Sequence, residues 1–178
     1  MTGDSSGVKW ELHGPAQRKA IMRTRTVSQP EEEAIRAGQR WLDLERLAEV
    51  EISSEDSKNP IRDALLSGRG SGWRADEPGK QIIRLLFAAP QDVYRIRLEF
   101  RESSMERTQE YVLRWSADGG NSLHEIVRQQ WNFSPEGATC ETEDYRVELL
   151  GLTLLELIIT PDISGRDALA SLAQLRMA

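Results

Sequence analysis

The strongest pattern in the chain is an alternation of apolar and polar residues with a period of two. It runs through Ile83–Phe87, Tyr94–Phe100, Tyr111–Trp115 and Tyr145–Leu149. Successive side chains of a β-strand point to opposite faces, so each segment predicts a strand with one face in a core and the other in water. A nearly unbroken apolar stretch, 154–160, predicts a central strand that is buried on both faces.

Turn signals separate these segments. Pro90 is predicted to end the first strand, and Asp118-Gly119 predicts a hairpin turn. The other expected elements are an extended segment at 47–54, a helical turn at 61–66 and a last strand over 172–177. Because no amphipathic helix lies between the strands, the pattern predicts an all-β fold, an antiparallel jelly-roll-like β-sandwich, rather than a parallel α/β sheet.

The first forty residues have a different character. A basic cluster at 18–25 precedes a capping-box pattern, Ser28-Gln29-Pro30-Glu31, in which side chain and backbone can satisfy each other at a helix start. We therefore predict a short helix at about 29–37. The expected organisation is an N-terminal arm at 1–40 with this one short helix, followed by a β-sandwich domain at 41–178.

Composition narrows the class of protein. The chain has 178 residues and a formal net charge of −6, which suits one domain and argues against a general nucleic-acid binder. No apolar stretch approaches the roughly 20 residues that a membrane-spanning helix needs, so no membrane partner is expected. The first residues lack the apolar core of a signal peptide, and the single cysteine, Cys140, cannot form an internal disulfide. We expect a cytoplasmic protein.

Residues suited to catalysis are few. Two distant histidines, His13 and His124, and one thiol cannot supply a zinc site, and no G-x-S-x-G motif is present. Cys140 has acidic neighbours, which raise rather than lower the pKa of a thiol. The glycine-rich segment 68–72 lacks the Gly-Lys-Ser/Thr of a phosphate-binding loop. We predict a protein that is not an enzyme, with no catalytic residues, no metal and no cofactor.

Aromatic residues with polar neighbours are the remaining candidates for a site. They occur in two segments that we predict to be loops. The residues are Trp73, Arg74, Trp131, Asn132 and Phe133. Aromatic rings in loops can stack on sugar rings or hold a peptide while polar neighbours bind hydroxyl groups. The alternative is that the rings close the open end of the sandwich core.

Three segments resemble one family. They are Val50–Ser54 with Asn59-Pro60, then Gly72-Trp73 with Ile83–Phe87 and Pro90 to Leu98, and the hairpin Tyr111–Gly119. From about Trp41 to Ala178 the chain resembles the galactose-binding-domain-like β-sandwiches, which include discoidin domains, coagulation-factor type C domains and many carbohydrate-binding modules. The resemblance implies a β-sandwich that binds a ligand through loops at one end, although this fold hosts many binding roles.

The resemblance also bears on whether this protein has a calcium site. Family members often hold a structural calcium with an L-D-G-(D/N) loop and a glutamate near the last strand. Here the loop reads Leu65-Leu66-Ser67-Gly68, and Gln174 stands at the place of the glutamate. Because calcium prefers charged oxygen ligands, no calcium site is expected.

Two functions follow from these observations. The first is a non-catalytic binding module that recognises a carbohydrate or glycan through loops at one end of the sandwich. The alternative is an intracellular protein–protein adaptor, in which the arm at 1–40 contacts a protein partner through its basic cluster and helix. The sequence leaves the identity of the ligand and the oligomeric state open.

Overall fold

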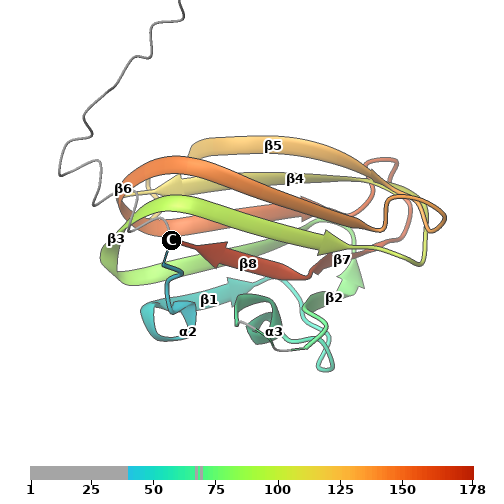
Figure 1. The fold of residues 1–178 in the computed structure, drawn as a ribbon, viewed down its shortest axis with the longest axis horizontal. Coiled ribbons are helices and arrows are strands. Elements are labelled where there is room, and N and C mark those ends of the chain that lie inside the picture. Colours follow the sequence, from blue (N-terminus) through green and yellow to red (C-terminus); the bar gives the residue numbers. More distant parts are fainter. Residues whose placement is uncertain (1–39, 67, 69) are drawn as a thin grey trace, which may run out of the picture.

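The computed structural model describes residues 40–178 except 67 and 69. Within them it is an antiparallel β-sandwich, which confirms the predicted fold class (Figure 1). The helix predicted at 29–37 and the basic cluster at 18–25 lie outside the described residues. Neither of the described helices is long and apolar enough to span a membrane.

Short helices precede long strands in the chain. The elements in order are α2 (Leu44–Leu47), β1 (Ala48–Ile52), α3 (Ile61–Leu65), β2 (Trp73–Pro78), β3 (Gln81–Arg101), β4 (Arg107–Ser116), β5 (His124–Phe133), β6 (Cys140–Thr160), β7 (Leu169–Leu172) and β8 (Gln174–Met177). The predicted extended segment at 47–54, helical turn at 61–66 and hairpin at Asp118-Gly119 all occur. Helix α2 was not predicted, since it is only one turn long.

Two strands, β3 and β6, take part in both layers of the sandwich. The first part of β3 pairs with β1 and with the end of β6, and β4 and β5 extend this layer in the order β1-β3-β6-β4-β5. The second part of β3 pairs with the first part of β6 and, on its other side, with β8. We call these layers the five-stranded sheet and the three-stranded sheet. The small β2–β7 pair continues beside the second of them.

The crossing between the layers corrects one prediction. Pro90 does not end a strand but lies at a corner within β3, where the pairing register with β6 shifts. On β6 the corner is at Gly151, whose φ of +70° is accessible to glycine at low cost. Its backbone N–H donates to Asp92 Oδ1 at 2.8 Å, which joins the two corners. Both strands therefore fold over the same end of the sandwich.

The core lies between the two sheets and consists mainly of aliphatic side chains. Its largest fully buried side chains include Trp73, Tyr111, Phe100 and Phe133. The rings of Phe100 and Tyr111, from opposite sheets, have centroids 4.9 Å apart. Burial of large apolar side chains is the main stabilising contribution to such a domain.

The two ends of the sandwich differ. One end, the corner end, carries the bends of β3 and β6, the β4–β5 hairpin and the C-terminus (Figure 1). The other, which we call the loop end, carries the connections β3–β4, β5–β6 and β6–β7. Segments of these connections are 102–106, 134–139 and 161–168. The loop end is therefore the place to look for polar groups that could form a ligand site.

Candidate functional site

A buried ion pair organises the loop end. Arg107 begins β4 and is 2% exposed, and Glu102, just after β3, is 5% exposed. Arg107 Nη1 lies 3.2 Å from Glu102 Oε2 and donates to the carbonyl of Leu169 at 2.8 Å. Glu102 Oε1 also accepts from the backbone and hydroxyl of Ser104, at 2.6 and 2.8 Å. These contacts join the β3–β4 connection to the start of β7.

The electrostatics of the pair reflect its burial. Burial lowers the pKa of Arg107, the charge of Glu102 raises it, and the nearby charge of Arg74 lowers it further, so that the net direction is downward. Burial raises the pKa of Glu102, but hydrogen bonds from Ser104 and the charge of Arg107 outweigh this effect and lower it.

The β6–β7 connection is attached to the start of β4. Asp162, 4% exposed, accepts from Ser164 and from Arg166 Nε, the latter at 2.6 Å. Arg166 Nη2 donates to the carbonyl of Glu106 at 2.7 Å. Ile163 N–H donates to the carbonyl of Thr108 at 2.9 Å, while its side chain remains 48% exposed. The loop is therefore held in place and still presents an apolar side chain and a guanidinium to solvent.

Accessible polar groups surround this loop. Asn132 is exposed, and its Oδ1 accepts from Thr108 Oγ1 at 2.7 Å, so its amide N–H groups remain available for a ligand. We define the end surface as Asn132, Ile163 and Arg166. It combines guanidinium and amide donors with one apolar contact, which suits hydroxyl-rich ligands.

Two of the predicted site residues are in the core, which corrects that interpretation. Trp73 is 1% exposed, its Nε1 donates to the carbonyl of Ser54 at 3.2 Å, and it begins β2 instead of lying in a loop. Phe133 is 1% exposed as well. A ring enclosed on both faces cannot stack on a ligand, so we assign both side chains to the core.

The other three predicted residues have different positions. Trp131, Asn132 and Phe133 lie in β5 and not in a loop, and Trp131 is half-buried against the core. Its Nε1 is buried and has no hydrogen-bond partner among the residues that the structure describes. Asn132 points away from the core, and Arg74 is partly exposed. Asn132 therefore stays in the candidate site, with Trp131 on the opposite, core-facing side of β5, whereas Arg74 lies opposite Ser171 in the β2–β7 pair.

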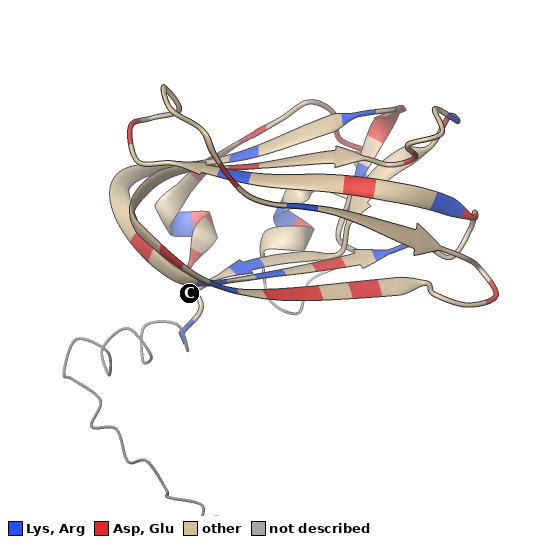
Figure 2. Ribbon diagram, turned by 90° about the horizontal axis from the view of Figure 1, so that it is seen from above, with Lys and Arg blue, Asp and Glu red and all other residues tan. Residues whose placement is uncertain are grey.

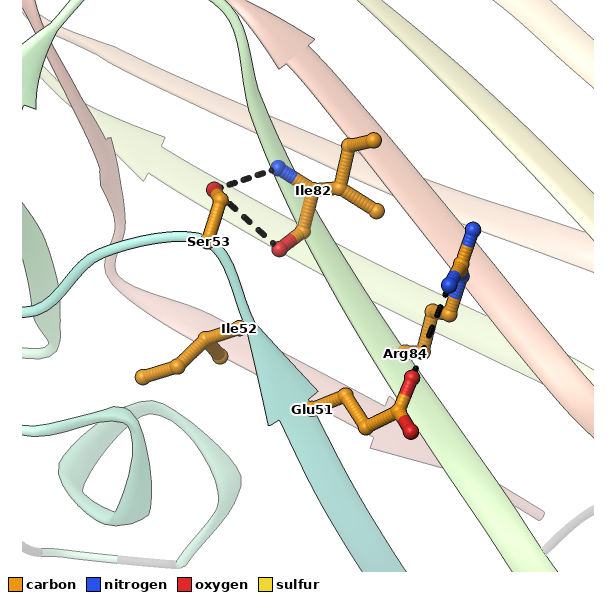
Figure 3. Close-up of a pocket in the computed structure, with 5 residues that line it drawn as sticks. All are labelled: Glu51, Ile52, Ser53, Ile82 and Arg84. Atoms are coloured by element: carbon orange, nitrogen blue, oxygen red, sulfur yellow. Dashed lines mark hydrogen bonds and ion pairs between the residues drawn. The ribbon is translucent and has the colours of Figure 1, made fainter.

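A hollow beside β1 is a weaker candidate for a ligand site. It encloses about 200 Å³ and is lined by Glu51, Ile52, Ser53, Ile82 and Arg84 (Figure 3). Its polar groups already contact one another, since Arg84 lies 3.5 Å from Glu51 and Ser53 Oγ accepts from the Ile82 N–H at 2.9 Å. We assign no ligand to this hollow.

The side chains at the place of the family's calcium loop do not suit calcium. Leu66 is apolar, Gly68 has no side chain and Gln174 is uncharged. Asp63 and Glu99 line the adjoining hollow, and Glu99 is already paired with Arg101 at 2.5 Å. Within the described ranges no three His, Cys, Asp or Glu side chains gather as metal ligands.

We therefore predict that calcium does not stabilise this protein. Calcium needs six to eight oxygen ligands, several of them charged, and this loop lacks them. In a thermal unfolding experiment, neither added calcium nor a chelator should change the melting temperature. A rise with calcium that the chelator reverses would contradict the prediction.

Comparison with known proteins places the fold. No protein-family model and no curated protein matches the sequence, whereas 94 chains in solved structures match. One is module CBM32-5 from Clostridium perfringens in complex with GalNAc-β-1,3-galactose, at 18% identity and a TM-score of 0.56, covering 78% of this chain and 99% of that one. Another is the family 32 module of C. perfringens NanJ in complex with galactose, at 14% identity and a TM-score of 0.53, covering 73% and 92%. A third is the module of AlyQ in complex with 4,5-unsaturated mannuronic acid, at 14% identity and a TM-score of 0.55, covering 78% and 98%.

These comparisons define the class of fold. The chain has the galactose-binding-like β-sandwich fold of family 32 carbohydrate-binding modules. Because the identities are low, the likeness concerns the fold alone.

Sequence reasoning missed Glu102, Arg107, Ile163 and Arg166. One signal was available in Asp162-Ile163-Ser164, where an aspartate two residues before a serine is typical of a turn closed by its side chain. The pairing of Glu102 with Arg107 depends on the path of the β3–β4 connection, which no periodicity shows.

Proposed function

We propose that this protein is a non-catalytic carbohydrate-binding module whose ligand contacts the end surface. The observation that carries the proposal is that the fold is shared with modules solved in complex with sugars. Among these ligands, galactose and GalNAc-β-1,3-galactose are neutral and rich in hydroxyl groups. The end surface provides N–H groups that can donate hydrogen bonds to the hydroxyl oxygens of such sugars.

The proposed recognition uses the rigid loop end. Arg166 is held by Asp162 and by the Glu106 carbonyl, so its guanidinium is preorganised for a sugar hydroxyl. Asn132, fixed by Thr108, offers its amide N–H groups. Ile163 supplies an apolar contact for the C–H face of a sugar ring. None of these roles requires a group that changes protonation, which accords with binding without catalysis.

A substitution on the end surface tests this proposal. We expect Asn132→Ala to weaken binding of a galactose-containing oligosaccharide by about tenfold, because it removes the amide donor at the site. Binding is measured by isothermal titration calorimetry with GalNAc-β-1,3-galactose. The melting temperature of the variant should equal that of the wild type.

The matched control is Asn121→Ala. Asn121 is also exposed, but it lies in the β4–β5 hairpin at the corner end, where its amide donates to the Asp118 carbonyl. Asn121→Ala should leave the affinity for the oligosaccharide unchanged. Equal losses in Asn121→Ala and Asn132→Ala would contradict the assignment of the end surface. The absence of binding to any galactose-containing oligosaccharide would favour the protein–protein adaptor.

A further inference from the structure

One row of charged residues on the five-stranded sheet alternates in sign from strand to strand. The row crosses all five strands on the outer face of the sheet, and neighbours in the row have opposite signs. The row is Glu51, Arg84, Glu156, Arg114 and Glu125. Arg84 Nε donates to Glu156 Oε2 at 2.8 Å, and Arg114 Nη1 lies 3.7 Å from Glu156 Oε1. Opposite charges on paired strands stabilise a sheet.

The three-stranded sheet instead places like charges opposite one another on paired strands. On its outer face Arg97 of β3 lies directly opposite Arg176 of β8, and Arg95 of β3 lies directly opposite Arg146 of β6. Like charges in directly opposed positions destabilise a sheet. We call these four residues the arginine face. Blue segments of β3 and β6 lie side by side next to the C-terminus in Figure 2.

The carboxylate of Asp144, which is directly opposite Arg97 on β6, lies among these arginines. Asp144 receives Arg95 Nε at 2.8 Å and Arg95 Nη2 at 2.5 Å. Arg97 and Arg146 form no ion pair with any residue in the described part of the chain, and Arg97 Nε is buried there without a hydrogen-bond partner. The hydrogen bonds from Arg95 chiefly lower the pKa of Asp144, and the charges of Arg97 and Arg146 add to this effect. Asp144 thus faces several guanidinium groups, while the other carboxylates of this face are Glu99, which pairs with Arg101, and Glu148.

An aromatic ring holds two of these guanidinium groups in position. Arg95 Cζ lies 4.9 Å from the centroid of the Trp41 ring, and Arg176 Cζ lies 5.9 Å from it. Cation–π contacts of this length are attractive. Arg176 also donates to the Leu65 carbonyl at 3.2 Å. The face is therefore partly ordered before any ligand arrives.

We propose that the arginine face binds a polyuronate, a glycan chain with one carboxylate on each sugar. Guanidinium groups bind carboxylates in a planar, bidentate geometry. The arginines lie about 6.6 Å apart along β3 and about 4.8 Å apart between strands, so several can contact one chain. The protein has a net charge of −6 and the excess of positive charge is local, which opposes binding of a denser polyanion such as DNA.

This proposal shares a ligand class with the proposed function but uses another face. The end surface lies at the end of β5 and in the β6–β7 connection, whereas the arginine face lies along β3, β6 and β8. Loss of one binding activity therefore need not affect the other.

The first test is the stability of the protein without ligand. Arg146→Gln removes the like-charge pair with Arg95 and should raise the melting temperature. Arg114→Gln is the matched control from the five-stranded sheet, and it should lower the melting temperature because it removes an attraction to Glu156. A fall for Arg146→Gln would mean that Arg146 already has a partner carboxylate, and would overturn the proposal.

The second test is binding by the full chain, with polygalacturonate as the probe. The wild type should bind it, with an affinity that falls as sodium chloride rises. Arg97→Gln and Arg146→Gln should each weaken binding about three- to fivefold, and Arg114→Gln should not. Neutral galactan should not respond to these substitutions.

Other outcomes would overturn the proposal. They are no binding of polygalacturonate, equal losses in Arg97→Gln and Arg114→Gln, or DNA binding as tight as polygalacturonate binding. Binding of polygalacturonate that depends on Arg97, without any response to GalNAc-β-1,3-galactose, would support the arginine face and count against the end surface. Binding of GalNAc-β-1,3-galactose without binding of polygalacturonate would support the end surface alone.

Discussion

Replacing Trp73 by alanine should lower the free energy of unfolding by about 3–5 kcal/mol, because a large, fully enclosed side chain leaves a cavity. Trp73 is 1% exposed and packs in the core opposite Leu172 of β7. Its Nε1 also donates to the Ser54 carbonyl at 3.2 Å, so the substitution removes a hydrogen bond as well. Urea denaturation followed by circular dichroism measures the change.

Trp73→Phe separates these two contributions. It retains most of the ring volume and loses the hydrogen bond, so the expected loss is much smaller, about 1–2 kcal/mol. A loss below about 1 kcal/mol for Trp73→Ala would show that the ring lies at a surface, as expected for a ligand-stacking residue, and would contradict its place in the core.

The second large effect concerns the ion pair of the loop end. Glu102→Gln keeps the size of the side chain but leaves Arg107 buried without its carboxylate. Breaking one side of a buried ion pair destabilises a protein by about 3–5 kcal/mol. We expect a loss near the lower limit at pH 7, because Arg107 still donates to the Leu169 carbonyl. The matched control is Glu106→Gln on the same connection, whose side chain is exposed and whose loss should be close to zero.

The effect of Glu102→Gln should depend on pH. The pKa of Glu102 is lowered in the folded protein, so its carboxylate contributes stability above the pKa of the unfolded chain. This contribution is lost as the pH falls through the folded pKa, because the wild type then carries a neutral acid like glutamine. The difference between wild type and Glu102→Gln should therefore shrink below about pH 4. A difference that stays constant from pH 7 to pH 3 would contradict the assigned role of the carboxylate.

Much of the fold could be predicted because alternation reports burial directly. The segments at 83–87, 94–100, 111–115 and 145–149 all lie in strands, and 154–160 lies centrally between β3 and β4. The alternation does not distinguish a break from a bend, so the single strand β3 was predicted as two. Pro90 lacks an N–H group, but one missing donor at an exposed corner does not end the pairing.

The candidate site was harder to predict, since it depends on contacts between distant residues. The alternation continues through Gln130-Trp131-Asn132-Phe133, with the rings on one side, and this pattern indicates a strand although we predicted a loop. Arg166 contacts the carbonyl of Glu106, sixty residues earlier in the chain. Residue types alone therefore identified Asn132 as an accessible polar group but not the loop that lies beside it.

The central claim is that a glycan binds at the loop end. The most direct measurement is a titration of the full chain, labelled with ¹⁵N, with GalNAc-β-1,3-galactose, followed by two-dimensional NMR. The account predicts saturable shifts for the backbone N–H groups of Asn132, Ile163, Ser164 and Arg166, with the hairpin around Asn121 unchanged. Shifts confined to the corner end, or no saturable shift with any galactose-containing glycan, would contradict it.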